Sequence, residues 1–156
     1  MSTYTTKIAH AHLKVQDLKQ SIDFYQKFFN LNFVEQVGDR YAFLSGNDFH
    51  HEIALQQVGP NAPANSHPHA VGLYHIAFEV PSQHDFAMAY QTIKAEGIHV
   101  SAVDHRISWA LYFKDPDGNG LEIYWDIRKT DHGKPFWEGE TIRLTDEEVL
   151  APLALA

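Results

Sequence analysis

Histidine is unusually frequent in this chain of 156 residues, with 11 copies. Because histidine is the commonest metal ligand and titrates near neutral pH, the positions of these residues decide what chemistry they can do. Sliding the sequence along itself by 65 residues aligns His10 with His75. A shift of 68 residues aligns Ile53-Ala54-Leu55 with Leu121-Glu122-Ile123. These matches indicate two related halves, with a histidine repeated in both and a carboxylate, Glu122, in the second half only.

Strand alternation predicts which of these side chains face the same way, because successive residues of a strand point to opposite faces of a sheet. In the opening strand of the second half, residues 72–80, His75 lies on the face opposite the apolar residues. In the last strand, Glu122 likewise lies opposite its apolar neighbours. The repeat register makes His10, rather than its same-face neighbour His12, the equivalent of His75.

His10, His75 and Glu122 together supply two imidazoles and one carboxylate from three strands. Such a set with open coordination positions suits non-haem Fe(II); Mn(II), Zn(II) or Ni(II) also fit, because the order of affinities alone does not select the metal. The position in the first half that corresponds to Glu122 is Ala54, which cannot coordinate a metal. The pattern therefore predicts a three-ligand site with positions left for water, substrate and O₂.

Each half of the chain has the pattern of one strand, one helix and three further strands. The helices are indicated by apolar residues at helical spacing next to capping residues: Leu18, Ile22, Tyr25 and Phe29 after Asp17, then Phe86, Tyr90 and Ile93 between Ser82 and Gly97. Turn-forming residues separate the strands. The expected strands are 7–15, 31–38, 40–46 and 50–58, then 72–80, 98–104, 107–114 and 119–127.

These elements predict an α+β fold of two paired βαβββ modules, about 7–58 and 72–127, within a single domain over residues 7–127. A helix covers one face of each sheet, so the two uncovered faces can come together and enclose a cavity. The segment 59–70 is rich in Pro and Asn and is expected to be a loop.

Residues 128–156 follow the second module as a C-terminal extension. A short helix is expected in it from about Thr145 to Leu150. An extension of this length must either dock on the domain or fray.

Composition narrows the class of protein further. The net charge is -8, with a pI near 5.7, which argues against binding nucleic acid by phosphate neutralisation. The chain has no Cys, which excludes disulfides and thiolate sites, and its 44% of hydrophobic residues can form a core. No apolar run has the length of a membrane span, and the N-terminus has no signal-peptide pattern. We therefore expect a cytoplasmic protein that binds neither nucleic acid nor membrane.

Several stretches of the chain resemble the vicinal oxygen chelate superfamily, which includes glyoxalase I, fosfomycin- and bleomycin-resistance proteins and dioxygenases. They are HAHLKVQDLKQSIDFYQKFF, HHEIAL, LYHIAFEV and LYFKDPDGNGLEIYWD, and the resemblance covers about residues 7–127. It implies that the two modules form an open, incomplete barrel around the metal site.

The sharper resemblance is to the type I extradiol ring-cleaving dioxygenases, through His51 in HHEIAL and Tyr112 in LYFKDPDGNGLE. It implies Fe(II), or occasionally Mn(II), on the three ligands named above, and a catechol-type ring cleaved with O₂. It also implies an acid–base role for His51, and a hydrogen bond from Tyr112 to the catecholate oxygen on the metal. His105 is the nearest match to a further histidine that holds the ionised substrate.

A small aromatic diol needs an apolar wall, for which we expect Trp109, Tyr124 and Trp125, with Phe136 and Trp137 as further candidates. Many extradiol enzymes are about twice as long and carry a second, inactive pair of modules. This chain resembles the catalytic pair alone, so we expect self-association, most simply as a homodimer.

Three other functions within the superfamily remain open. Glyoxalase I, a metal-dependent lyase or isomerase, normally has a fourth ligand where this chain has Ala54, although Glu52 could substitute after a register slip. A fosfomycin-type thiol transferase would need a cationic pocket, and the strands offer little beyond Arg40 and Arg106. A non-catalytic module of the bleomycin-resistance kind would bind a ligand without a metal.

Overall fold

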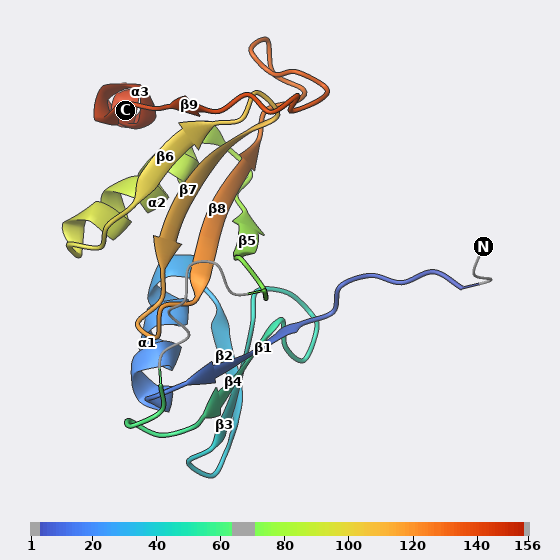
Figure 1. The fold of residues 1–156 in the computed structure, drawn as a ribbon, viewed down its shortest axis with the longest axis vertical. Coiled ribbons are helices and arrows are strands. Elements are labelled where there is room, and N and C mark those ends of the chain that lie inside the picture. Colours follow the sequence, from blue (N-terminus) through green and yellow to red (C-terminus); the bar gives the residue numbers. More distant parts are fainter. Residues whose placement is uncertain (1–3, 64–70, 155–156) are drawn as a thin grey trace. The chain divides into compact units, whose positions relative to one another are not determined.

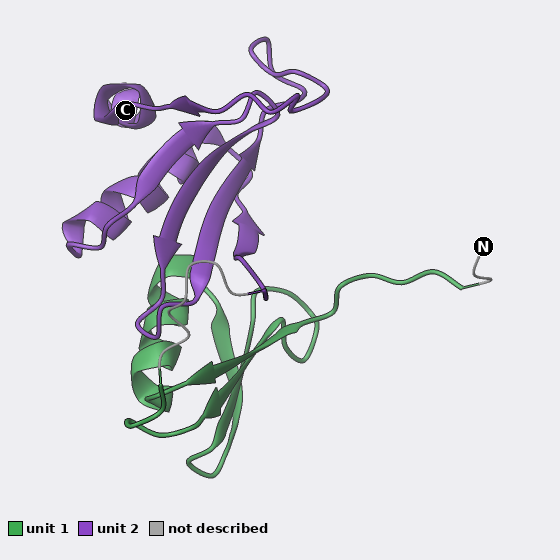
Figure 2. Cartoon of the chain, viewed as in Figure 1, with its two compact units in different colours: residues 1–65 green, residues 66–156 purple. Residues whose placement is uncertain are grey.

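The computed structural model describes residues 4–63 and 71–154, which fall into two compact units, 1–65 and 66–156 (Figure 2). Each unit is described by itself. The expected loop 59–70 spans the division between the units, and its residues 64–70 lie outside the described part of the chain.

Unit 1 is one mixed four-stranded sheet with one helix (Figure 1). Its elements are β1 (Ala11–Val15), α1 (Leu18–Phe29), β2 (Asn32–Val37), β3 (Tyr41–Ser45) and β4 (Ile53–Gln57). The strand order is β1-β4-β3-β2, with β1 parallel to β4 and the other pairs antiparallel. The helix begins after Asp17, whose carboxylate accepts from the backbone N–H of Gln20, and buries Leu18, Ile22 and Tyr25.

Unit 2 repeats this plan and adds a C-terminal segment (Figure 1). Its elements are β5 (Ile76–Glu79), α2 (Gln83–Ala95), β6 (Ser101–Asp104), β7 (Ser108–Lys114), β8 (Gly120–Asp126), β9 (Ile142–Arg143), α3 (Asp146–Leu150) and a 3₁₀ turn (Ala151–Leu153). The strand order is β5-β8-β7-β6-β9, with β5 parallel to β8. One face of the sheet packs against α2, where the buried Phe86 ring meets the ring of Trp109 edge to face.

The predicted α+β fold of two βαβββ modules is confirmed, including the caps at Asp17 and Ser82. The strand pairing also confirms the repeat, because His12 pairs with Ala54 in unit 1 and Ala77 with Glu122 in unit 2. The opening strands are shorter than expected, since β1 and β5 begin just after His10 and His75. The single domain over 7–127 stays a prediction.

The C-terminal extension docks on unit 2. Its strand β9 pairs with β6, and the predicted helix is present as α3, with a capping box between Thr145 and Glu148. Asp146 fixes α3 to α2: its carboxylate accepts a hydrogen bond from the hydroxyl of Tyr90 at 2.7 Å and forms an ion pair with Lys94.

Among the described residues, no helix combines the length and the apolar character that crossing a membrane requires.

Phe86 tests the packing of α2 on the sheet. Phe86→Ala should lower the free energy of unfolding by about 3–5 kcal/mol, because it leaves a cavity beneath Trp109. Met88→Ala on the same helix is the matched control, since Met88 is 45% exposed while Phe86 is 0% exposed. Urea unfolding of both variants measures the difference, and equal losses would show that α2 does not bury Phe86 as described.

Asp146 gives the docking of α3 a defined pH dependence. The hydrogen bonds from Lys94 and Tyr90 lower the pKa of Asp146 in the folded protein. The stabilisation that Asp146 gives to the docked α3 is therefore fully present above the pKa of an unfolded Asp, about 3.9, and is lost as pH falls through the folded pKa. Hydrogen exchange in α3, corrected for intrinsic rates, should accelerate in acid, whereas Asp146→Asn should exchange faster already at neutral pH. Glu147→Gln, on the same helix, should leave neutral exchange unchanged; faster exchange in that control would mean that any lost charge loosens α3.

Candidate metal centre and active site

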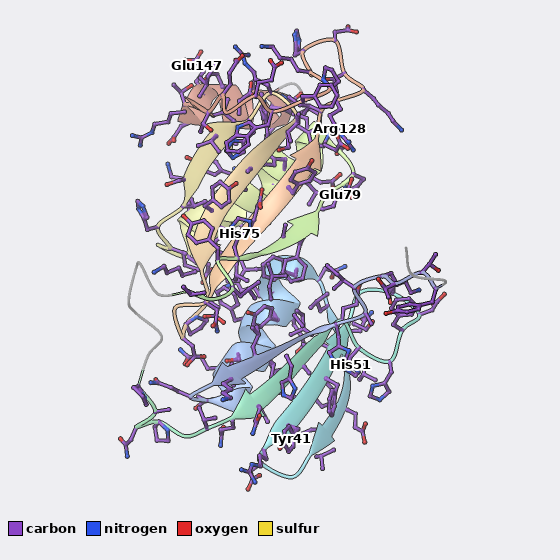
Figure 3. The ribbon with its side chains drawn as sticks, turned by 45° about the vertical axis from the view of Figure 1, so that its right-hand side comes forward. Tyr41, His51, His75, Glu79, Arg128 and Glu147 are labelled. Atoms are coloured by element: carbon purple, nitrogen blue, oxygen red, sulfur yellow. The ribbon has the colours of Figure 1, made fainter. Side chains whose placement is uncertain are left out.

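Glu122 is a buried carboxylate on β8, paired with a histidine. It is 5% exposed, and its Oε2 lies 2.9 Å from Nε2 of His75. His75 directly precedes β5 and is labelled in Figure 3. The two side chains meet because parallel pairing sets Glu122 beside Ala77, and His75 shares the face of Ala77. Gly120 permits this approach, since a side chain there would collide with the backbone carbonyl oxygen of Tyr74.

The His75–Glu122 pair has the donor types and spacing of two ligands to one cation. Two atoms that each lie about 2.1 Å from an ion, at a right angle, stand about 3 Å apart. The other ring nitrogen of His75, Nδ1, is buried and has no hydrogen-bond partner among the described residues, so the polar contact that these residues give the imidazole is the one from Nε2 to Glu122. Burial raises the pKa of Glu122, while His75 and the Tyr112 hydroxyl oppose that shift. The pair therefore fits a divalent metal.

Two further predicted residues extend the pair along the sheet face. The Tyr112 hydroxyl on β7 donates to Oε1 of Glu122 at 3.3 Å, and Nε2 of His105 lies 2.9 Å from the same hydroxyl oxygen. The face is shared because Tyr112 pairs directly with Glu122, while His105 follows the end of β6 and pairs its backbone with Ser108. Burial raises the pKa of Tyr112 well above its usual range, and the nearby carboxylate adds to the shift.

In unit 1, His10 and His51 lie together. Their ring centroids are 4.5 Å apart, and the His51 ring also contacts Phe43 on β3. Burial lowers the pKa of His51, and the neighbouring histidines, His10 first, add to the effect. The His50 ring contacts Phe43 as well, and its Nε2 lies 3.2 Å from Glu35. Phe43 pairs with Ala54, so the His50 and His51 rings that contact Phe43 lie on the face of Ala54. Of these two, His51 is the one beside His10.

The expected aromatic wall is only partly on the site face. Tyr124 shares the face of Glu122, two residues further along β8. Trp109 and Trp125 pair with each other across β7 and β8 on the opposite face, where Trp109 meets Phe86 of α2. Placing these two tryptophans against the substrate was therefore wrong: strand alternation turns them toward the helix.

A pocket of about 320 Å³ lies in unit 2 beside His75 and Tyr112. Its apolar walls include Ile98, Phe113 and Leu121. Phe113 and Leu121 pair with each other on the face of Trp109 and Trp125, so these two walls lie on the helix side of the sheet and not beside Glu122.

Unit 2 by itself brings together four predicted site residues, His75, Glu122, Tyr112 and His105, and unit 1 brings together His10 and His51. Over residues 4–63 and 71–154, no group of three or more His, Cys, Asp or Glu side chains stands ready to hold a metal ion. Each unit by itself supplies only part of the predicted three-ligand set.

Comparison with known proteins shows relatives that are named as dioxygenases of catechol and of biphenyl-2,3-diol. The chain is 28% identical over 161 residues to biphenyl-2,3-diol 1,2-dioxygenase 2 of Rhodococcus globerulus, covering 99% of this chain and 84% of that protein. It is 32% identical over 121 residues to the catechol-2,3-dioxygenase of Bacillus subtilis strain 168, covering 78% of this chain. The match spans only 42% of the length of that Bacillus relative.

The fold is shared with a glyoxylase/bleomycin resistance protein/dioxygenase domain from Frankia sp. EAN1pec, with a TM-score of 0.66 and 22% identity over 79% of this chain and 99% of that one. The family model of the Glyoxalase/Bleomycin resistance protein/Dioxygenase superfamily matches residues 7–123. The chain belongs to this superfamily.

Proposed function

We propose that the protein is an Fe(II)-dependent extradiol dioxygenase, which cleaves the ring of a catechol-type diol with O₂. The observation that carries the proposal is the contact of Glu122 with His75 on one side and with Tyr112 on the other, with His105 next to Tyr112. A ligand pair with a phenol and an imidazole alongside suits binding and deprotonation of a diol. The names of the relatives support the same reaction class.

The proposed metal ligands are His10 from unit 1 and His75 with Glu122 from unit 2. Two histidines and one carboxylate favour Fe(II), with Mn(II), Zn(II) or Ni(II) as other ions that the set can hold. When bound, the cation supplies open positions and positive charge that favours the deprotonated diol.

The remaining residues act on the diol and its protons. We assign Tyr112 and His105 to hydrogen-bond an ionised diol oxygen. The contact of the Tyr112 hydroxyl with the proposed ligand Glu122 on one side and with His105 on the other supports this assignment. His51, beside His10, is assigned to proton transfer, because imidazole titrates in the neutral range. Tyr124, on the face of Glu122, offers the aromatic ring an apolar wall.

Two competing reactions each lack a part in this structure. A glyoxalase I needs a fourth ligand, yet Ala54 occupies that position and no register slip brings Glu52 to it. The Glu52 carboxylate instead accepts hydrogen bonds from Gly46 and Asn47 in its own turn. For a thiol transferase, Arg40 or Arg106 would have to face an anionic substrate. Arg106 pairs with Glu140, and the Arg40 guanidinium lies over the Tyr41 ring. Self-association as a homodimer and a cytoplasmic location stay predictions.

The reaction class is tested by anaerobic reconstitution with Fe(II), followed by catechol, 3-methylcatechol and 2,3-dihydroxybiphenyl in air. We expect O₂ uptake together with a yellow ring-opened product. His75→Ala and Glu122→Gln should lose bound iron and at least about 100-fold in kcat/KM, whereas His84→Ala and Glu79→Gln should retain both. Turnover of a methylglyoxal–thiol adduct with Ni(II) or Zn(II), without O₂ uptake, would instead identify a glyoxalase. Purified protein that binds no metal would indicate a ligand-binding module.

Tyr112→Phe separates chemistry from metal binding. Removing one hydrogen-bond donor from a developing charge typically lowers kcat by about 10²–10³-fold, so kcat should fall while the iron content stays that of the wild type. Tyr90→Phe is the control, because its hydroxyl serves Asp146 on the outer helix. Loss of iron in Tyr112→Phe would mean that Tyr112 supports the ligands rather than the substrate.

A further inference from the structure

The C-terminal extension reaches the site face through Thr141, which directly precedes β9. Its Oγ1 lies 2.9 Å from Nδ1 of His105, a residue 36 positions earlier in the chain. The other ring nitrogen of His105 faces the Tyr112 hydroxyl, also at 2.9 Å. Both nitrogens of the imidazole are therefore engaged, one by the sheet and the other by the extension.

The partners of this chain of contacts determine the direction of its hydrogen bonds. The Tyr112 hydroxyl donates its single hydrogen to Oε1 of Glu122. The Tyr112 oxygen must then accept from Nε2–H of His105. A neutral imidazole protonated at Nε2 has an accepting Nδ1, which receives the hydroxyl hydrogen of Thr141.

The segment before Thr141 is anchored next to His105 by several independent contacts. Glu140 accepts from the Arg106 guanidinium at 2.9 Å and pairs with Lys134 at 2.6 Å. The Trp137 indole N–H donates to the Glu140 carbonyl oxygen, and its ring meets the His105 ring edge to face with centroids 5.7 Å apart. These contacts before Thr141, and the pairing of β9 with β6 after it, hold Thr141 next to His105.

We propose that Thr141 is a positioning residue for His105: by donating to Nδ1, it holds the imidazole as the tautomer that donates through Nε2 toward Tyr112. This inference rests on the proposed function for its catalytic consequence, though not for the tautomer itself. The extension is then part of the active site, because it selects which nitrogen of His105 carries the proton.

The direct test is the tautomer of His105 in the metal-free protein, read from the ¹⁵N shifts of its two ring nitrogens by long-range ¹H–¹⁵N NMR. The wild type and Thr141→Ser, which keeps the hydroxyl, should show a protonated Nε2 and an accepting Nδ1. Thr141→Val removes the donor with little change of shape and should shift the ring toward a mixture of tautomers. Thr141 is exposed, so the variant should fold, and Thr92→Val is the control for loss of a threonine hydroxyl elsewhere in unit 2. An unchanged tautomer in Thr141→Val would overturn the proposal, as would a Thr141→Ser protein that behaves like the valine variant.

Kinetics of the iron-loaded enzyme give the second readout. Thr141→Val should lower kcat/KM about 10- to 100-fold, the usual cost of losing an outer-shell partner, with unchanged iron content. In a His105→Ala background the same substitution should have no further effect, because it acts only through His105. An additive loss in the double variant would contradict the positioning role. If the wild type shows no dioxygenase activity, the proposed function fails, while the NMR result still decides whether Thr141 sets the tautomer.

Discussion

The burial of one carboxylate on the face of a sheet governs the architecture of the site. Placing Glu122 out of water costs several kcal/mol unless charge and hydrogen bonds compensate it. The structure meets that requirement with the His75 imidazole on one side and the Tyr112 hydroxyl on the other. Both partners depend on strand pairing, and the pairing of β5 with β8 depends on a glycine at 120. A buried ion pair adds little to the free energy of folding, so the burial of Glu122 beside His75 favours a role in binding a cation.

From Glu122 the polar contacts run outward across the sheet without a break, through Tyr112 and His105 to Thr141. The last link lies in the C-terminal extension, which is held by the pairing of β9 with β6, by the ion pairs of Glu140 and by the docking of α3 on α2. The extension is therefore joined to the same polar network as the candidate ligands. In unit 1, His10 and His51 form a separate pair of contacting rings at the start of β1 and β4.

Local patterns in the sequence were sufficient for the modules and for part of the site. The helical spacing of Phe86, Tyr90 and Ile93 and the strand alternation around Glu122 are short-range signals, and both are confirmed. Alternation could not place His51, because β4 begins two residues later and the phase does not extend before it. For Trp109 and Trp125 the error came from weighing aromatic character above the strand phase, which already turned Trp125 away from Glu122. No pattern links Thr141 to His105, whose contact is made by tertiary packing across 36 residues.

The central proposal is that His10, His75 and Glu122 are ligands of one divalent ion. Crystals grown anaerobically with Fe(II), with anomalous diffraction recorded at the iron edge, test it most directly. We predict one strong peak with a ring nitrogen of His10, a ring nitrogen of His75 and a carboxylate oxygen of Glu122 at about 2.0–2.3 Å. Iron held by His75 and Glu122 without His10, or iron bound at another set of residues, would contradict the claim.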